Sequence, residues 1–253
     1  MTAPNAAEGV TVATTDRGLR FAAAKHEQLA TAKGERTRAR ILDTALRLFH
    51  ERGWRGTTMR DVAAESGVSL GNAYYYFASK ESLIQAIYAQ SHEEHAAASE
   101  PVLARERTFR ARLGGLMKAK LDTLAPYHRF AGVLFATASD PASPLNPWSA
   151  ASEPVRANSR ALFARTLEGC DAGIPKALRE DLPELLWTYH MGIILFWVHD
   201  RSPGCAASYR LAERTVDMVA RMVTLSRLPP LRPLVRSVLS LMADLRDASA
   251  PAA

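Results

Sequence analysis

Residues 53–80 read GWRGTTMRDVAAESGVSLGNAYYYFASK, and they carry the most specific structural pattern in the N-terminal part of the chain. Its pattern predicts one short helix over Met59–Glu65 and a second over about residues 69–76, with an interruption at Ser66-Gly67-Val68. The interruption needs a residue that tolerates the left-handed backbone conformation, and Gly67 supplies it. Two short helices joined by such a turn are the pattern of a helix-turn-helix, which places its second helix in the major groove of DNA.

The helices of this segment have recognisable ends. Thr58 and Asp61 have the spacing of a capping box, and Ser69 is a good N-cap for the second helix. Ahead of them, apolar residues recur at helical spacing from Glu35 to Arg52, and Gly53 stops that helix. The sequence therefore predicts a head of three helices.

The second short helix has the composition of a helix that enters a groove. Ala63 and Ala64 are small and would let the two helices cross closely. Ser69, Gly71 and Asn72 are small or hydrogen-bonding, so they suit an approach to base edges in a major groove about 12 Å wide. Binding to double-stranded DNA is the function that this pattern favours.

The segment resembles the DNA-binding head of the tetracycline-repressor (TetR) family over about residues 35–90. The matching motifs are Gly53-Trp54, Thr57-Thr58, the helix Met59–Glu65, Gly67-Val68-Ser69, Tyr74-Tyr75-Tyr76-Phe77 and Lys80-Glu81-Ser82-Leu83. Beyond residue 100 only the helical character agrees. The resemblance implies a ligand-binding and dimerising body there, and it implies repression of transcription.

The resemblance also implies roles for residues of the head. Those that would face base edges are Ser69, Leu70, Gly71, Asn72 and Tyr74. Those that would hold phosphates are Thr58, Tyr75, Tyr76 and Lys80. Large aromatic side chains also pack in cores, so packing stays an alternative for Tyr75 and Tyr76, and we expect Phe77 to be buried.

The chain as a whole is predicted to be all-α, with the N-terminal three-helix helix-turn-helix head joined to a larger helical-bundle body. We expect a disordered or partly helical tail over residues 1–33, the DNA-binding domain over 34–80, and an effector-binding and dimerisation domain over 81–253. The helices expected in the body cover about 102–124, 127–138, 153–170, 176–200, 206–227 and 231–246. Three prolines between residues 141 and 147 mark a loop.

Composition narrows the partners and the compartment. The net charge of +6 and the sequence pI of about 9.5 favour an anionic partner, although only weakly. Cys170 and Cys205 lack the spacing of a disulfide framework or a zinc site, so we expect packing thiols in a reducing cytoplasm. The longest apolar stretch, residues 185–198, falls short of the ~20 residues that cross a bilayer, so no membrane contact is expected.

The C-terminal helices have apolar faces that need a cover. Residues 185–198 are apolar on nearly every side, so neighbouring helices or a partner subunit must enclose them. The last two helices carry Tyr209, Val216, Val219, Met222 and Val223, then Leu231, Leu234, Val235, Val238 and Met242. These rows could bundle across a two-fold axis or form the core of one subunit. We expect a homodimer, because one short recognition helix makes too few base contacts alone.

A small, largely hydrophobic effector is expected in the body, and no cofactor or metal is predicted. Apolar walls with a few polar groups suit such an effector. The candidate pocket residues are Met117, Leu121, Tyr127, Phe130, Phe135, Phe163, Trp187, His190, Met191 and Ile194. An ordinary core position is the alternative for each of them, and for His190 that alternative is a hydrogen-bonded core histidine.

Two other functions compete with DNA binding. His92 and His95 form a HEEH sequence, but it lacks the spacing and the third ligand of a zinc enzyme, so a surface helix with titrating histidines is expected. A helical adaptor that binds protein through the head is the second alternative. An adaptor would not need groove-sized residues beside a phosphate-binding rim, and it would not show the steep salt dependence of DNA binding.

Overall fold

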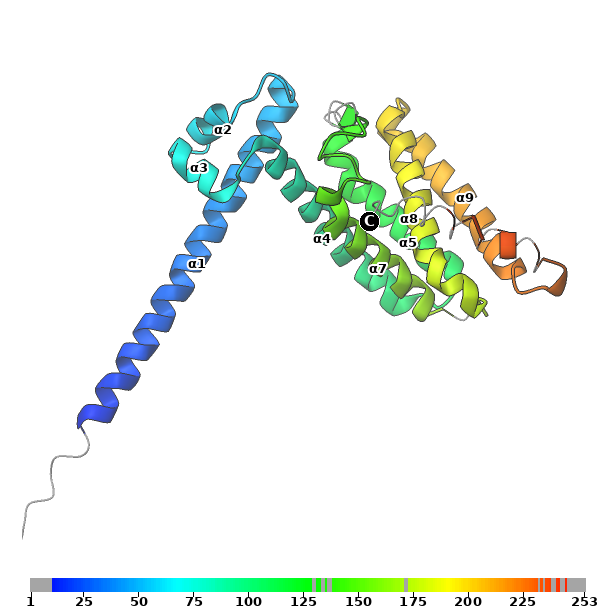
Figure 1. Ribbon diagram of the computed structural model, residues 1–253, viewed down its shortest axis with the longest axis horizontal. Helices are drawn as coiled ribbons and strands as arrows, with labels where there is room; N and C mark the ends of the chain where they lie inside the picture. The colour runs from blue at the N-terminus through cyan, green and yellow to red at the C-terminus, as the bar shows by residue number, and fades with distance from the viewer. Residues whose placement is uncertain are drawn as a thin grey trace, which may run out of the picture. The chain divides into compact units, whose positions relative to one another are not determined.

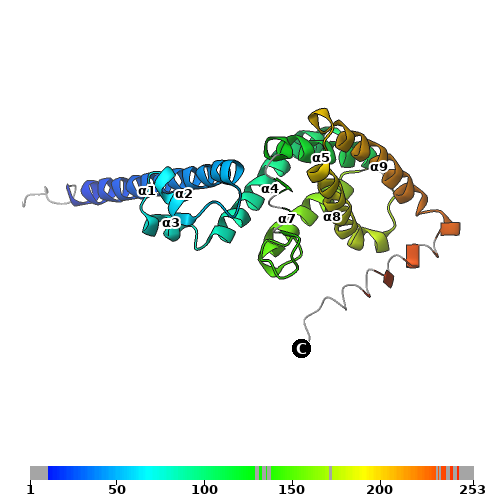
Figure 2. The ribbon, with the colours of Figure 1, turned by 90° about the horizontal axis from the view of Figure 1, so that it is seen from above.

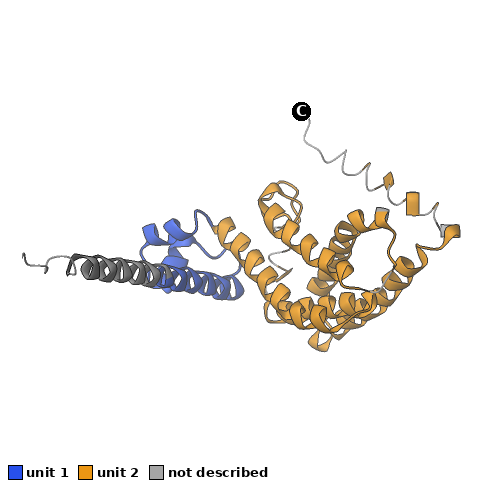
Figure 3. Ribbon diagram, turned by 90° about the horizontal axis from the view of Figure 1, so that it is seen from below, with its two compact units in different colours: residues 1–79 blue, residues 80–253 orange. Residues whose placement is uncertain are grey.

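The computed structural model describes residues 11–128, 131, 132, 135, 138–170, 173–231, 233, 235–237, 240, 241 and 244 (Figure 1). These residues lie in helices, turns and irregular segments, with no strand among them. The predicted all-α fold is therefore confirmed. The chain divides into two compact units, Met1–Ser79 and Lys80–Ala253, coloured separately in Figure 3.

The described residues of the first unit form three helices: α1 (Thr11–Arg52), α2 (Met59–Glu65) and α3 (Leu70–Tyr76). The predicted helices of the head are confirmed, and Leu19–Lys33 continues the first of them. Residues 1–10, where disorder was expected, lie outside the described residues. The buried apolar side chains of this unit are Ile41, Leu42, Ala45, Leu48, Phe49, Met59, Val62, Ala63, Ala73 and Phe77.

The turn between α2 and α3 is closed by backbone hydrogen bonds. Gly67 has φ +68°, the left-handed conformation that glycine adopts without steric cost. Its N–H donates to Ala64 O at 3.1 Å, and the N–H of Val68 donates to Ala63 O at 3.0 Å. These two bonds satisfy carbonyls in the last turn of α2, as glycine-containing C-caps do. Ala63 is buried as predicted, but the prediction that Ala64 also lies at the crossing is wrong, because its side chain is exposed.

The second unit is a bundle of longer helices. They are α4 (Lys80–Arg105), α5 (Phe109–Leu124), α7 (Glu153–Glu168), α8 (Lys176–His199) and α9 (Ala206–Leu225), with short 3-10 turns η1 (Ala125–Tyr127), η2 (Ala150–Ser152), η3 (Pro203–Cys205) and η4 (Pro229–Leu231). Helix α5 contacts α4, α7, α8 and α9, while α7 runs alongside α8 (Figure 2). The core of the bundle is therefore built around α5.

The first boundary inside the body differs from the prediction. A single helix over 102–124 was expected to start after Pro101, but Pro101 lies inside α4, which continues to Arg105. Helix α5 begins only at Phe109, where the Thr108 hydroxyl accepts a hydrogen bond from Ala111 N. This cap, rather than Pro101, therefore determines where α5 begins.

The predicted helices 153–170, 176–200 and 206–227 agree with α7, α8 and α9 within two residues at each end. The described residues between 128 and 138 are helical, as are those between 233 and 244 that the structure describes. Leu234, Val238 and Met242, three of the residues predicted to cover a partner or a core, lie outside the described residues. Neither Cys170 nor Cys205 is in a disulfide.

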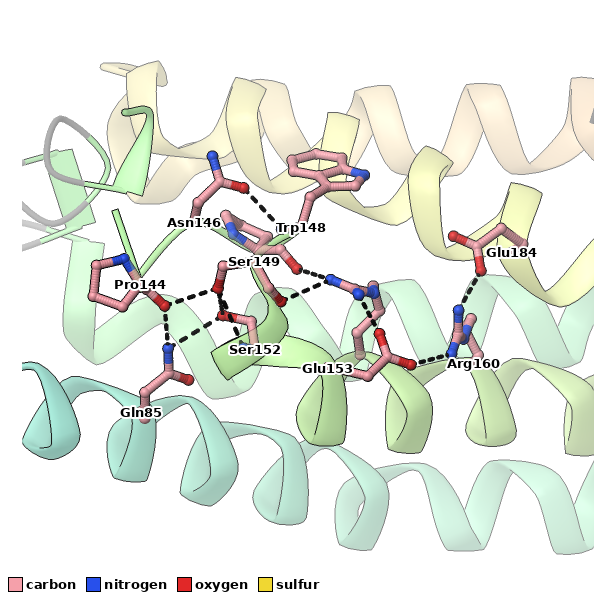
Figure 4. Close-up of polar contacts among 11 residues, drawn as sticks. Gln85, Pro144, Asn146, Trp148, Ser149, Ser152, Glu153, Arg160 and Glu184 are labelled. Atoms are coloured by element: carbon pink, nitrogen blue, oxygen red, sulfur yellow. Dashed lines mark hydrogen bonds and ion pairs between the residues drawn. The ribbon is translucent and has the colours of Figure 1, made fainter. Parts of the chain in front are cut away.

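The proline-marked loop before α7 is held by side chains of α4 and α7 (Figure 4). Gln85 of α4 donates its amide N–H to Pro144 O at 2.6 Å and to Ser152 Oγ at 3.2 Å. On the α7 side, Arg156 donates to Pro147 O at 2.6 Å and, weakly, to Ser149 O at 3.4 Å. The loop is thus fixed to two helices of the body, which agrees with the predicted break in helical structure there.

A buried arginine joins the ends of two helices. The Arg112 guanidinium donates to Leu103 O and Glu106 O at the end of α4, and to Arg165 O, Thr166 O and Gly169 O at the end of α7. Carbonyls at helix ends have no partner further along their own helices. Arg112 therefore satisfies both helix ends with one side chain.

Among the described residues, no helix combines the length and the apolar composition that a membrane span requires.

Candidate DNA-binding surface and effector site

Helix α3 has one buried side and one side that faces solvent. Ala73 and Phe77, four residues apart, are buried, so the core position expected for Phe77 is confirmed. Ser69, Gly71 and Asn72 are exposed, as is Tyr74 at 48%. Leu70, also predicted to meet a base, is half-buried at the start of the helix.

The exposed tyrosines form the outer part of this surface. Tyr75 is 81% exposed, which rules out the core position considered for it. Tyr76 is half-buried, and its ring meets that of Tyr75 edge-on with centroids 5.2 Å apart. A phenol exposed in this way can donate its O–H to a phosphate oxygen.

The N-terminus of α3 is fixed by its cap. Ser69 Oγ accepts a hydrogen bond from Asn72 N at 3.1 Å. The hydroxyl hydrogen of Ser69 is not used in that bond, so it stays able to donate to an acceptor on DNA. This cap orients the first turn of α3, where most of the residues predicted to read bases lie.

Thr58, a predicted phosphate contact, already forms hydrogen bonds with Asp61. Its backbone N–H and its hydroxyl both point to Asp61 Oδ2, at 2.8 and 2.6 Å, and its Oγ1 accepts from Asp61 N. The predicted capping box is confirmed. The Thr58 bonds lower the pKa of Asp61, so this carboxylate stays charged beside Thr58. A phosphate contact from Thr58 would therefore have to compete with its cap.

Two arginines of the head form ion pairs within it, whereas a third lies over an aromatic ring. Arg47 and Arg52 of α1 bond Glu65 of α2 at 3.0 and 3.1 Å and tie the two helices together. Arg38 lies over the ring of Phe77, with 5.1 Å from its guanidinium carbon to the centroid. Lys80, a further predicted phosphate contact, begins α4, and partial burial lowers the pKa of its ammonium group.

The predicted pocket residues fall into three sets. Those buried in the core of the body are Met117, Leu121, Phe163, Trp187 and His190. Those half-buried are Tyr127, Phe135, Met191 and Ile194. Phe130 lies outside the described residues. The structure thus brings Met117, Leu121, Phe163 and Trp187 together as packed side chains of one core.

His190 lies at a polar point inside that core. Its ring is 4% exposed, and neither ring nitrogen has a hydrogen-bond partner among the described residues. The expectation of a hydrogen-bonded core histidine is therefore wrong. His95 stacks on it with centroids 5.9 Å apart and planes 8° from parallel, and Phe163 meets it edge-on at 5.5 Å.

His95 also departs from the prediction of a surface helix. It is buried, and its Nε2 lies 2.9 Å from Leu116 O. Burial, followed by the charge of Lys120, lowers the pKa of His95 to about 3. Among the described residues no group of three or more His, Cys, Asp or Glu is placed to hold a metal ion.

A separate hollow of about 360 Å³ lies between the end of α8 and the start of α9. Its walls include His128, Trp197, Arg201 and Tyr209. The predicted pocket residues that the structure describes do not line it. Periodicity could not have indicated it, because its walls come from helix ends.

The outward sides of α8 and α9 carry large apolar residues. Met218 and Met222 of α9 are 62% and 66% exposed, and Leu225 follows one turn later on the same side. Val216 and Val223, which were considered for a subunit interface, are instead buried in the core of their own chain. On α8, Leu195 and Phe196 are exposed.

A capped helix-turn-helix with an outward-facing second helix, in a chain whose second unit is an all-helical body, defines the class of protein: a DNA-binding regulator of transcription. The family model described as "Bacterial regulatory proteins, tetR family" matches residues 41–87, and "Tetracyclin repressor-like, C-terminal domain" matches residues 112–241. The chain belongs to the tetracycline-repressor (TetR) family, a family of regulators rather than enzymes.

Individual relatives agree with this assignment. The chain is 41% identical over 63 residues to the HTH-type transcriptional regulator TtgR of Pseudomonas putida, which is 25% of this chain and 30% of that protein. It is 33% identical over 91 residues to the HTH-type transcriptional repressor KstR2 of Rhodococcus jostii, which is 36% of this chain and 45% of that protein. The chain thus matches less than half the length of these curated relatives.

The fold is also found in solved structures. The TetR transcriptional regulator from Nitrosomonas europaea superposes with a TM-score of 0.58 at 21% identity, over 72% of this chain and 97% of that one. This likeness extends the agreement in fold to the body, where the sequence offers no motif of its own.

Proposed function

We propose that the protein is a dimeric repressor that binds a palindromic operator through α3 and is released from it by a small molecule. The observation that carries the DNA-binding part is the exposed side of α3, where Ser69, Asn72 and Tyr75 stand outward from a helix whose opposite side is buried. A helix of this kind fits the major groove, and the polar residues of its first turn can reach base edges. One of the matched relatives is itself named a repressor.

Two copies are needed because α3 has only seven residues. One such helix reaches few base pairs, so a second copy about one turn of duplex away supplies the rest of the contacts. The exposed row of Met218, Met222 and Leu225 on α9 favours a second copy as its cover, since monomers rarely expose apolar rows of this kind. A protein with this function acts where the chromosome is, in the cytoplasm.

The DNA-binding proposal is tested by selecting bound fragments from random and genomic DNA with the purified full-length protein. We expect an inverted repeat with half-sites about one helical turn apart, and an affinity that falls by orders of magnitude between low and moderate salt. Failure to bind any duplex at low ionic strength would refute the proposal. Binding without salt dependence would favour the adaptor alternative.

The contact roles separate by substitution. Asn72→Ala should relax sequence preference at one position by about 1–3 kcal/mol, because it removes a base contact. Tyr75→Ala combined with Lys80→Ala should lower the affinity for all sequences together, because phosphates carry no sequence information. An equal loss on every sequence for Asn72→Ala would show that Asn72 does not read a base.

The dimer is tested by sedimentation of a variant that carries Met218→Glu with Met222→Glu, beside one that carries Met218→Leu with Met222→Leu. We expect the charged pair to give a folded monomer with strongly reduced operator affinity, and the leucine pair to stay dimeric. A charged variant that remains dimeric would show that α9 is not the interface.

A further inference from the structure

A cluster of ionisable side chains lies inside the body, and the DNA-binding function does not use it. We call it the His–Lys centre: His92 and His95 of α4, Lys120 of α5 and His190 of α8. Lys120 bonds Ser91, the residue before His92, while His95 bonds Leu116 O one turn before Lys120 on α5, and His190 stacks on His95. In keeping with this placement, the charge of Lys120 lowers the pKa of each of the three histidines, after burial itself. The centre thus joins three helices of the bundle.

Lys120 is a buried cation without an ion-pair partner among the described residues. Its ammonium donates to Ser91 Oγ at 2.9 Å and, weakly, to Ser91 O at 3.4 Å. The carboxylate of Glu94 favours the charged form of Lys120 but accepts its hydrogen bond from Gln90 instead. Burial lowers the pKa of Lys120 to about 8, so the group still carries its charge at neutral pH.

The histidines of the centre can donate hydrogen bonds, but none of them supplies a negative charge to balance Lys120. His95 bonds Leu116 O, and His92 Nδ1 lies 3.2 Å from Ser159 Oγ. His190 has no partner at either nitrogen among the described residues. Burying an imidazole without a hydrogen bond costs folding free energy, and so does burying a cation without a counter-ion. A group that lies there at a cost to stability has the signature of a binding site.

The charge and the hydrogen-bond donors of the His–Lys centre indicate which kind of ligand would complete it. A metal ion would be repelled by Lys120, whereas an anion would pair with it and accept from His190. Phe163 meets the His190 ring edge-on at 5.5 Å, and Met117 and Trp187 are buried in the same core, so these apolar side chains suit an uncharged, apolar remainder of the same molecule.

We propose that the His–Lys centre binds the acidic group of the effector, a monocarboxylic acid with an apolar or aromatic body, with the carboxylate paired to Lys120 and accepting a hydrogen bond from His190. This rests on the proposed effector control of DNA binding. The centre includes His92 and His95 of α4, the helix that follows the DNA-binding unit directly in sequence, so the bound carboxylate changes the balance of charges along that helix.

The test compares acids with their neutral amides on the purified full-length protein. The probes are butyrate, hexanoate, decanoate, benzoate and phenylacetate, each beside its primary amide, with thermal unfolding, calorimetric titration and operator affinity as readouts. We expect at least one acid to raise the Tm and weaken operator binding, while its amide does neither.

Two variants separate a binding role from a structural one. Lys120→Met and His190→Phe should lower the affinity for the active acid at least tenfold, while the Tm of the ligand-free variants equals or exceeds that of the wild type. Lys118→Met, on the same helix but exposed, is the matched control and should keep wild-type affinity. A group with only a structural role would lower the ligand-free Tm when it is replaced.

The proposal is overturned if no acid in the set raises the Tm, if the amides bind as tightly as the acids, or if Lys118→Met weakens binding as much as Lys120→Met. Failure of effector control, or of DNA binding, gives results that differ from failure of the acid-binding proposal. If acids bind through Lys120 but operator affinity does not change, effector control is wrong while the anion site stands. If the ligand-free wild type binds no duplex, the DNA-binding function fails independently of the acids.

Discussion

Two buried cations on α5 have opposite surroundings. Arg112 donates to five backbone carbonyls at the ends of α4 and α7. Lys120 lies eight residues further on, about 12 Å along the helix at 1.5 Å per residue, and among the described residues its ammonium group bonds only Ser91. Burial alone therefore does not tell what a charged residue does. The first cation completes the hydrogen bonding of the fold, and the second lacks the partner that would complete its own.

Replacing Arg112, the cation whose hydrogen bonds are satisfied, should change the stability of the protein the most. Arg112→Met should lower the free energy of unfolding by roughly 3–5 kcal/mol, because it leaves several buried carbonyls without a donor. Urea unfolding followed by circular dichroism measures this. Arg110→Met removes an exposed arginine paired with Asp217 and should cost less than about 1 kcal/mol. Similar losses for both variants would mean that Arg112 is not a structural link.

The free energy of unfolding should fall in acid because of the buried histidines of the His–Lys centre. Burial holds the pKa of His95 at about 3 and that of His190 well below its usual value, whereas both titrate near 6.5 in the unfolded chain. Below pH 6.5 the unfolded chain binds protons that the folded chain does not, so stability present above pH 6.5 is lost as the pH falls toward 3. We expect a loss of roughly 2–4 kcal/mol between pH 7 and pH 5, measured by urea unfolding across that range.

The same pH series with His190→Phe sharpens this expectation. Removing one of the two buried histidines should make the fall between pH 7 and pH 5 about half as steep, because one fewer proton is linked to unfolding. An unchanged slope would show that His190 does not contribute.

Replacing the second cation should have the opposite sign to replacing the first. Lys120→Met keeps most of the length of the side chain and removes an unpaired buried charge, so the ligand-free protein should gain about 1–3 kcal/mol in free energy of unfolding. Urea unfolding at pH 7 checks it, with Lys118→Met as the exposed control. A loss of stability would place Lys120 with Arg112 as a structural group and end the contrast between them.

The smallest expected effect concerns the head, where local geometry rather than burial is decisive. Gly67→Ala should cost about 1 kcal/mol, because φ +68° strains any residue with a Cβ. Gly71→Ala in α3 has no such φ and open space around its Cβ, so it should be neutral or stabilising by up to about 1 kcal/mol. Thermal unfolding of the two variants side by side tests this, and equal losses would contradict it.

The local structure of the head could be predicted from the sequence because its caps and its turn depend on residues that are close together in the chain. The Thr58–Asp61 box, the Ser69 cap and the left-handed Gly67 act within three or four residues of themselves, and each lies where it was predicted. The break between α4 and α5 was misplaced because Pro101 is tolerated inside α4, and the Thr108 cap decides the boundary.

Caps, turns and helical periodicity depend on neighbours in the chain, so the helix-turn-helix and the all-α class could be predicted without knowledge of the packing. The packing of distant helices, in contrast, brings His95 and His190, 95 residues apart, into a stack within the electrostatic influence of Lys120. Periodicity states that a residue lies on the inner side of a helix, but not which polar groups of other helices meet it there or whether they satisfy it. That depends on how the helices of the body pack, and it separates Arg112 from Lys120.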